Sequence, residues 1–201
     1  MSPEGLRERY EHLRDEIGPG VRVVVATKYV SADEMAVLAE AGVEVVGENR
    51  LQDLVAKQER WGDRFEWQFI GQLQSRKARE VSTRCTLLHS LDSLSAARRL
   101  EIPALVEVNL SGEDSKAGVA KGDLAAFLHE AGEAGADIRG LMTMPPFTED
   151  PERSRPYFRE LRELAHQHGL TELSMGTSQD YRIAIEEGAT LLRVGSKLLR
   201  G

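Results

Sequence analysis

Short apolar segments alternate along the chain with longer segments in which apolar residues recur every three or four positions. The short segments are rich in β-branched residues, as buried strands are, and the longer ones have the spacing of amphipathic helices. This alternation is typical of a parallel sheet covered by helices. The eight predicted strands span residues 21–27, 43–47, 66–70, 86–90, 104–109, 137–142, 172–174 and 190–194.

Helix signals occupy the segments before and between these strands. A leading helix is predicted over residues 3–17, with Pro3 in the first turn, where its missing N–H costs little. Ser31 and Glu34 form a capping box for the next helix, which Gly42 ends. The other predicted helices span residues 49–59, 75–81, 93–100, 121–134, 151–168 and 178–187.

Eight β/α units without a Pro/Gly-rich linker predict an α/β fold, a single (β/α)₈ TIM barrel with an extra N-terminal helix and one domain over residues 1–201. This length lies at the lower edge of the roughly 200 to 250 residues that such barrels use. Residues 93–100 leave little room for a helix before Pro103, so we expect thin covering there. A doubly wound open sheet is the alternative.

Composition removes several classes of partner. The chain has 26 Lys and Arg against 33 Asp and Glu, a net charge of −7, which gives no general attraction to nucleic acid. No run approaches the roughly 18 to 20 apolar residues of a membrane span, and the N-terminus lacks the apolar core of a signal peptide. The single cysteine, Cys85, and the five histidines have no metal-ligand spacing. We expect a cytoplasmic protein without a bound metal.

Lys28 directly follows the first predicted strand, in the segment RVVVATKYV. The carboxyl ends of barrel strands form the functional rim. Partial withdrawal from water there would favour the neutral amine, which is the form that attacks an aldehyde. The alternative is a strand-end lysine whose ammonium group reaches solvent. Tyr29 is expected to point away from Lys28 if the strand continues through both residues, because side chains alternate along a strand.

Two turns near the C-terminus have the composition of anion-binding loops. Ser174, Gly176, Thr177 and Ser178 lie at a predicted strand-to-helix junction, and Gly195 and Ser196 follow the last strand. Small residues let backbone N–H groups approach an anion, and barrels often bind phosphate in the loops after their last two strands. Each motif alone is also compatible with an ordinary turn.

Arg193 lies within the last apolar strand, two residues before Gly195. Its side chain either enters the barrel mouth or points outward among the helices. A buried guanidinium needs a partner, and the ring nitrogen of a heterocyclic cofactor would serve. Glu107 and Asn109, at the end of the fifth strand, could line the barrel mouth, or Asn109 could cap the following turn.

With these residues in place, the sequence resembles the pyridoxal phosphate homeostasis protein family, whose fold is similar to the N-terminal barrel of alanine racemase. The resemblance covers nearly the whole chain. Gln72 and Arg76 depart from it, standing where relatives often have histidine and asparagine. The matching motifs are VVVATK, GENRLQD, WQFIGQLQSRK, LHSLDS, VEVNLSGEDSKAG, GLMTM, LSMGTSQD and LLRVGS.

The resemblance implies a pyridoxal 5'-phosphate cofactor held as a Schiff base on Lys28. It places Arg193 near the pyridine nitrogen and Asn49 beside the ring, although Asn49 could instead cap the following helix. The phosphate would be bound by the remaining predicted site residues, which are Ser174, Gly195 and Ser196, assisted by Thr177 and Ser178.

Binding of the cofactor is favoured over catalysis. An arginine at the ring nitrogen opposes its protonation and makes a weak electron sink, and racemisation also needs a second acid/base. In the related racemases a tyrosine from an additional domain fills that role, and no such domain is expected in a sequence that continues only to Gly201. We expect a monomeric carrier that buffers pyridoxal phosphate and passes it to apo-enzymes. The alternatives are a weak amino-acid racemase and an aldolase that uses Lys28 directly.

Overall fold

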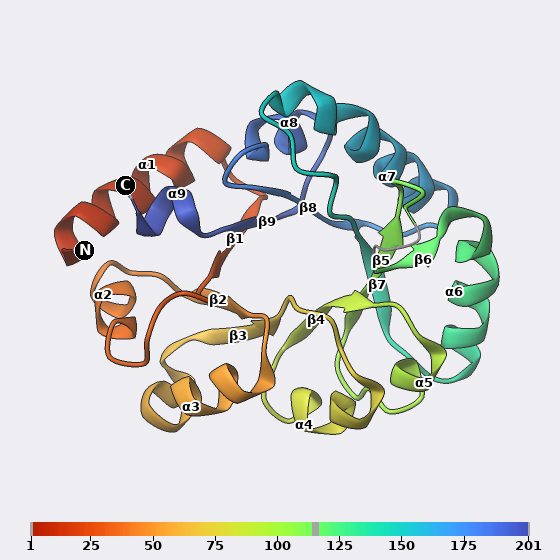
Figure 1. Ribbon diagram of the computed structural model, residues 1–201, viewed down its shortest axis with the longest axis horizontal. Helices are drawn as coiled ribbons and strands as arrows, with labels where there is room; N and C mark the ends of the chain where they lie inside the picture. The colour runs from red at the N-terminus through yellow and green to blue at the C-terminus, as the bar shows by residue number, and fades with distance from the viewer. Residues whose placement is uncertain (1, 114–116, 201) are drawn as a thin grey trace.

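Eight parallel strands close into a barrel in the computed structural model, which describes residues 2–113 and 117–200. Neighbouring strands follow the order β4-β3-β2-β1-β9-β8-β7-β5, and a β4–β5 pairing closes the ring. Helices surround the ring on the outside (Figure 1). The predicted barrel is therefore confirmed, and the open-sheet alternative is wrong. The strands are β1 (Arg22–Ala26), β2 (Val45–Glu48), β3 (Glu66–Phe69), β4 (Leu87–Leu91), β5 (Ala104–Asn109), β6 (Val119–Ala120), β7 (Ile138–Met142), β8 (Glu172–Thr177) and β9 (Leu191–Val194).

The helices follow the predicted order but are mostly shorter than predicted. The reciprocal Ser31–Glu34 hydrogen bonds of the capping box form, yet the helix itself begins only at Met35. Several predicted first turns are 3₁₀ segments, at Ser75–Lys77, Lys121–Asp123 and Pro151–Ser154, with a further one at Gly62–Arg64. The α-helices are α1 (Pro3–Ile17), α2 (Met35–Glu40), α3 (Leu51–Trp61), α4 (Ala78–Ser82), α5 (Leu94–Ala97), α6 (Leu124–Glu133), α7 (Arg155–Gln167), α8 (Tyr181–Glu186) and α9 (Ser196–Leu199).

Alternate residues of the strands serve two separate cores. Val23 and Val25 pack in the large core between the strands and the helices, whereas Val24 packs in a small cluster inside the barrel. This division follows from the two-residue period of a strand. The interior cluster consists of Val24, Val45, Leu87, Leu105, Met142 and Leu191, with Ile70 packed against it.

The N-terminal helix α1 forms because its sequence supplies both ends and one apolar face. The Ser2 hydroxyl accepts a hydrogen bond from the Gly5 amide, Pro3 occupies the first turn, and Gly18 ends the helix with a φ of 70°. The helix packs against α2 and α9, so both chain ends lie on the same side of the barrel (Figure 1). Its buried face consists of Leu6, Tyr10, Leu13 and Ile17.

Three elements differ from the sequence-based prediction in ways that affect the site. Strand β8 continues through Thr177 rather than ending at Ser174, and α8 begins only at Tyr181. The short helix α9 follows Gly195 directly. Strand β6 pairs with the end of β5 and is too short, at two residues, to give a periodic signal. The expected thin covering after β4 is confirmed, since α5 has four residues.

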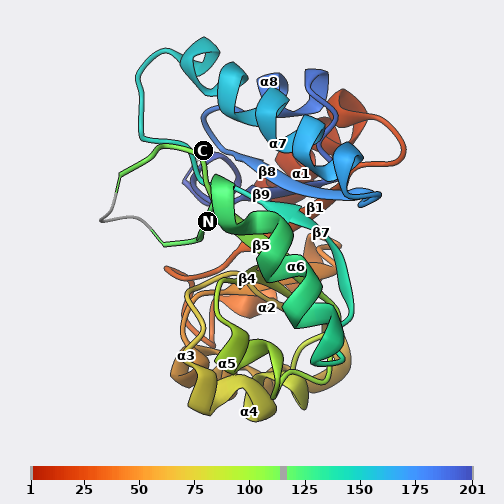
Figure 2. The same cartoon turned by 90° about the vertical axis from the view of Figure 1, so that its right-hand side faces the viewer.

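The loop between β7 and α7, residues 143–150, projects from one side of the barrel (Figure 2). Phe147 in this loop is exposed. Across residues 2–113 and 117–200, no helix has the length and apolarity that crossing a membrane requires.

Candidate functional site

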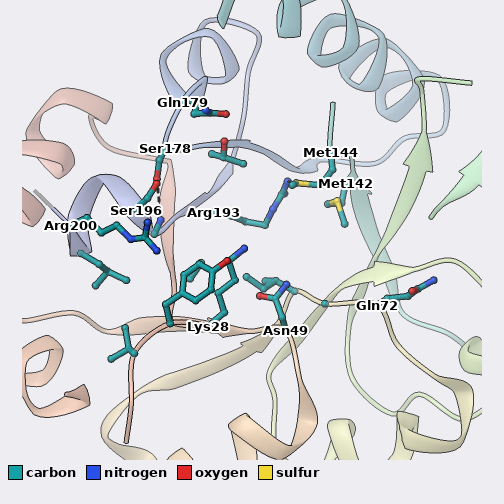
Figure 3. A pocket seen from close by; sticks show the side chains of 18 of the residues that line it. Lys28, Asn49, Gln72, Met142, Met144, Ser178, Gln179, Arg193, Ser196 and Arg200 are labelled. Atoms are coloured by element: carbon teal, nitrogen blue, oxygen red, sulfur yellow. Dashed lines mark hydrogen bonds between the residues drawn. The ribbon is translucent and has the colours of Figure 1, made fainter. Parts of the chain in front are cut away.

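A cavity of about 670 Å³ opens at the carboxyl ends of the barrel strands. Its walls come from both ends of the sequence (Figure 3). Of the predicted site residues, all but Ser174 line this cavity. The lining residues used below are Lys28, Tyr29, Asn49, Gln72, Glu107, Met144, Thr177, Ser178, Arg193, Gly195, Ser196 and Arg200.

Lys28 lies in the turn that follows β1, and its side chain is exposed on the cavity wall. The described residues alone therefore do not withdraw the amine from water, contrary to the expectation. Its Nζ lies 4.9 Å from the centre of the Tyr29 ring, and the Arg200 guanidinium lies 5.3 Å from the same ring. The prediction that Tyr29 points away from Lys28 is wrong, because β1 ends at Ala26 and the chain turns before both residues.

A buried ion pair lies beneath the turn that carries Lys28. The Lys57 ammonium donates to the Thr27 carbonyl oxygen at 2.8 Å and to a Glu48 carboxylate oxygen at 2.5 Å. The Thr27 hydroxyl also donates to Glu48. Burial raises the pKa of Glu48, and the bonds from Lys57 and Thr27 work against that rise. The pair fixes the backbone immediately before Lys28.

Asn49 follows β2 and points into the cavity (Figure 3). Its amide oxygen is buried and has no hydrogen-bond partner in the described part of the chain. Gly71, after β3, lies directly against its backbone: a Cβ at Gly71 would come within 2.1 Å of the Asn49 carbonyl oxygen. Only glycine fits there. The interpretation of Asn49 as a helix cap is wrong, because Arg50 occupies that position and no side chain caps α3.

The two predicted anion loops lie together on the opposite wall. The Ser178 hydroxyl oxygen accepts hydrogen bonds from the backbone N–H groups of Gly195, at 3.2 Å, and Lys197, at 3.1 Å. The predicted contribution from the helix after β8 is wrong, because α8 begins at Tyr181, three residues beyond Ser178. The two N–H groups belong to Gly195, which lies between β9 and α9, and to Lys197, in the first turn of α9, which begins at Ser196.

Thr177 is held by Asp180 at the start of α8. Its backbone N–H donates to Asp180 Oδ1 at 2.7 Å and its hydroxyl donates to the same oxygen at 3.0 Å. Ser154 donates to the other carboxylate oxygen of Asp180 at 2.9 Å. These bonds fix the end of β8 and leave Ser178 at the cavity surface.

Arg193 enters the barrel mouth, which decides between the two orientations that the sequence left open. The residue is 6% exposed. Its guanidinium donates to the Ser174 hydroxyl at 2.5 Å, the Thr143 carbonyl oxygen at 2.9 Å and the Met144 sulfur at 2.8 Å. Burial lowers the pKa of Arg193 to about 10, and the charge of Glu107 opposes this shift. The guanidinium therefore stays protonated at neutral pH.

Ser174 lies one layer below the cavity, in the barrel interior. It is fully buried, and its hydroxyl contacts Arg193 and His89, which lies 2.7 Å away. The sequence placed Ser174 among the residues that bind the phosphate. In the structure it lies below the cavity instead, because β8 continues for three residues beyond it. We place Ser174 with Arg193 instead.

Glu107 lines the cavity from β5, at the barrel mouth as the sequence suggested. Burial raises its pKa to about 6, the charge of Asp92 adds to this rise, and the charge of Arg193 opposes it. Asn109 binds its own turn, where its side-chain oxygen accepts hydrogen bonds from the Ser111 amide and hydroxyl.

Sequence reasoning missed several residues of this region. Tyr29, Met144 and Arg200 line the cavity, but none of them was predicted to do so. Gln68 and His89 lie inside the barrel below it. Both are polar residues within otherwise apolar strands, and that interruption is the signal that could have revealed them.

Fold and site together define a barrel protein that binds a small anionic molecule at the carboxyl ends of its strands. A lysine amine and an amide oxygen without a partner in the described part of the chain lie on one wall, and the small residues Ser178, Gly195 and Ser196 lie on the other. The family model described as "Alanine racemase, N-terminal domain" matches residues 2–200.

Curated relatives show to which family of barrel proteins the chain belongs. Pyridoxal phosphate homeostasis protein from Aquifex aeolicus is 37% identical over 211 residues, which cover 95% of this chain and 92% of that protein. The protein of the same name from Deinococcus radiodurans is 39% identical over 204 residues, which cover 96% and 95%. The structure of PipY from Synechococcus elongatus, solved with PLP bound, has a TM-score of 0.87 at 33% identity and covers 96% of this chain and 99% of that one. The chain belongs to the pyridoxal phosphate homeostasis protein family.

Proposed function

We propose that this chain binds pyridoxal 5'-phosphate at Lys28 and acts in the homeostasis of this cofactor, by buffering it and delivering it to apo-enzymes. One observation carries the proposal. The amine of Lys28 lies on the same cavity as Ser178, Gly195 and Ser196, the small residues of the loops after β8 and β9. An aldehyde and a phosphate on one small molecule would meet both. The PLP-bound structure of PipY, at 33% identity, supports this assignment.

The residues present fit the cofactor. The buried Asn49 amide oxygen has no partner among the described residues, so a ligand donor would satisfy it. Arg193 uses three of its five N–H groups on Ser174, Thr143 and Met144. The Nε–H and one Nη1–H remain for a ligand atom. No carboxylate in the described ranges forms an ion pair with Lys28, whose amine is thus available for covalent bonding.

Each residue then has a distinct task. Lys28 would bond the aldehyde carbon with release of the aldehyde oxygen as water, and Gly195 with the Ser178 and Ser196 hydroxyls, which line the same cavity, would bind the phosphate. Thr177 shapes the phosphate loop through Asp180. When bound, the cofactor supplies an amine-reactive aldehyde and an electron-withdrawing ring. Arg193 would donate to the ring nitrogen and keep it unprotonated, which would weaken that withdrawal.

This arrangement suits a carrier better than an enzyme. The exposure of Lys28 gives water and amines from solution access to the bond that it forms, as release of a cofactor requires. The protonated Arg193 opposes the ring protonation that carbanion chemistry uses. We propose a monomeric, cytoplasmic carrier whose partners are pyridoxal phosphate and apo-enzymes that depend on it.

A transfer assay tests the carrier function. Protein loaded with pyridoxal phosphate and freed of excess cofactor is mixed with an apo-aminotransferase, and recovery of aminotransferase activity is followed over time. We expect recovery from the loaded wild type and none from Lys28→Arg taken through the same loading. Ser95→Ala, an exposed substitution outside the cavity, is the matched control. Failure of loaded wild type to activate the apo-enzyme would contradict delivery.

A weak amino-acid racemase is the second candidate, and the presence of Tyr29 in the cavity lining favours it. The centre of its ring lies 4.9 Å from Lys28 Nζ, and racemisation requires its phenol to reach the face of the substrate opposite Lys28. Conversion of L-alanine to D-alanine, followed by chiral chromatography, measures this activity. Racemase function requires conversion well above that of free cofactor and its loss in Tyr29→Phe. Equal conversion in both proteins would leave Tyr29 without a catalytic role.

A further inference from the structure

A continuous line of hydrogen bonds runs through the barrel interior and ends at Arg193. The Gln68 amide nitrogen lies 2.8 Å from Glu66 Oε1, and its amide oxygen lies 2.7 Å from His89 Nε2. His89 Nδ1 lies 2.7 Å from the Ser174 hydroxyl, which lies 2.5 Å from Arg193 Nη1. All but Glu66 in this line are less than a tenth exposed.

The lower end of the line is a fixed acceptor. Burial raises the pKa of Glu66, but hydrogen bonds from Gln68, Arg22 and Thr86 outweigh it and hold that pKa below its usual range. Both carboxylate oxygens lie 2.8 Å from Arg22 Nη2. The ionised carboxylate can only accept, so the Gln68 NH₂ group must face it.

This single constraint orients every other group in the line. Since the Gln68 nitrogen faces Glu66, its oxygen faces His89, and His89 must carry its proton on Nε2. Nδ1 is then an acceptor, and the Ser174 hydroxyl donates a hydrogen bond to it. Ser174 is left with only lone pairs for Arg193, which can only donate.

His89 keeps this arrangement because it stays neutral. Burial lowers its pKa well below the usual value, and the charges of Arg193 and Arg22 lower it further. A neutral imidazole has one donor and one acceptor, as the line requires. Every donor along the line points away from the cavity and toward the carboxylate of Glu66.

We propose that Gln68 and His89 are positioning residues that act through Ser174 to orient Arg193 for the ring nitrogen of the cofactor. This inference rests on the function proposed above. The line occupies one Nη1–H of Arg193, while Thr143 and Met144 take the donors of Nη2. The free Nε–H and Nη1–H are thereby held at the cavity wall. Loss of the His89 acceptor frees the Ser174 hydroxyl and removes this constraint.

The first test uses protein without cofactor. Side-chain ¹⁵N NMR of His89 should show a proton on Nε2 and none on Nδ1, and this state should persist as the pH is lowered through the titration range of an ordinary histidine. In Gln68→Leu the Nε2–H loses its acceptor, and the tautomer should become mixed. A proton on Nδ1, or a normal histidine titration in the wild type, would overturn the proposed line.

The second test measures the loaded protein with pyridoxal phosphate as probe. In His89→Leu the ring nitrogen should protonate more readily, so the pH at which the visible band changes should rise by about one unit, and the dissociation constant should increase about tenfold. Ser174→Ala should act in the same direction. His89→Asn, which keeps an acceptor near the Nδ1 position, should recover part of the wild-type behaviour.

Leu88→Ala is the control for lost stability, because Leu88 neighbours His89 on β4 but packs in the outer core. It should leave the visible band unchanged. A band in the wild type that neither His89→Leu nor Ser174→Ala alters would overturn the positioning role while leaving the cofactor site intact. A wild type that shows no band with pyridoxal phosphate would overturn the proposed function, and with it the role assigned here.

Discussion

Glu107 offers a direct test of the electrostatics of the cavity. Its carboxyl has a pKa of about 6 in the folded chain against an ordinary 4.5, with burial as the first cause and the charge of Asp92 as the second. Because a tenfold change in proton affinity is worth about 1.4 kcal/mol, ionised Glu107 costs the folded protein about 2 kcal/mol. Glu107→Gln removes this cost.

The sign of the pH dependence follows from proton affinity. The folded chain binds the Glu107 proton more tightly than the unfolded chain does, so the free energy of unfolding falls as the pH rises from about 4.5 to about 6. Above about pH 6 ionised Glu107 lowers the free energy of unfolding by the full amount, and below about pH 4.5 it does not lower it. The stability of Glu107→Gln relative to wild type should therefore rise by about 2 kcal/mol between pH 4 and pH 7.

Urea unfolding without cofactor, followed by the fluorescence of the buried Trp67, measures this difference at each pH. Titrating groups that are not coupled to Glu107 contribute equally to both proteins and cancel in the difference. Glu101→Gln, at an exposed position, controls for the loss of one carboxylate. A stability difference that stays flat between pH 4 and pH 7 would refute the assignment of a raised pKa to Glu107.

Two further predictions concern the backbone around the site. Gly71→Ala should destabilise the protein by about 3 kcal/mol, because its Cβ would lie 2.1 Å from the Asn49 carbonyl oxygen. Gly122→Ala, where no atom lies within 4 Å, is the control in the same urea assay, and equal effects would contradict the reasoning. Lys57→Met should cost about 3 to 5 kcal/mol at neutral pH, since it leaves Glu48 buried without its cation. Adding Glu48→Leu should recover much of that loss, and a double variant no more stable than Lys57→Met would contradict an ion-pair origin.

The barrel was predictable because its signals are local and repeated. Each buried strand is a short apolar run, and each connection has either helical spacing or turn residues. Strand β6 and helix α9 escaped prediction for the opposite reason: they have two and four residues, too few to establish a period. The predicted start of α8 at Ser178 was too early. The Asp180 side chain accepts a hydrogen bond from the Thr177 backbone and forms a turn there instead of a helix.

The site was predictable where a residue lies at or close to a strand end. Lys28 lies two residues after the end of β1, Arg193 lies near the end of β9, and both line the cavity. Ser174 was assigned to the wrong layer, since the length of β8 is set by pairing with β9 rather than by local sequence. The line through Gln68 and His89 depends on contacts between strands far apart in sequence, and no local pattern specifies such contacts.

The attachment of the cofactor to Lys28 is the central claim, and peptide mass spectrometry after borohydride reduction tests it most directly. The protein is incubated with pyridoxal phosphate, reduced, digested and searched for lysines that carry the reduced cofactor. We predict modification at Lys28, and its loss when Lys28→Arg is treated in the same way. Absence of modification at Lys28, or equal labelling of Lys197 and other lysines at stoichiometric cofactor, would contradict the account.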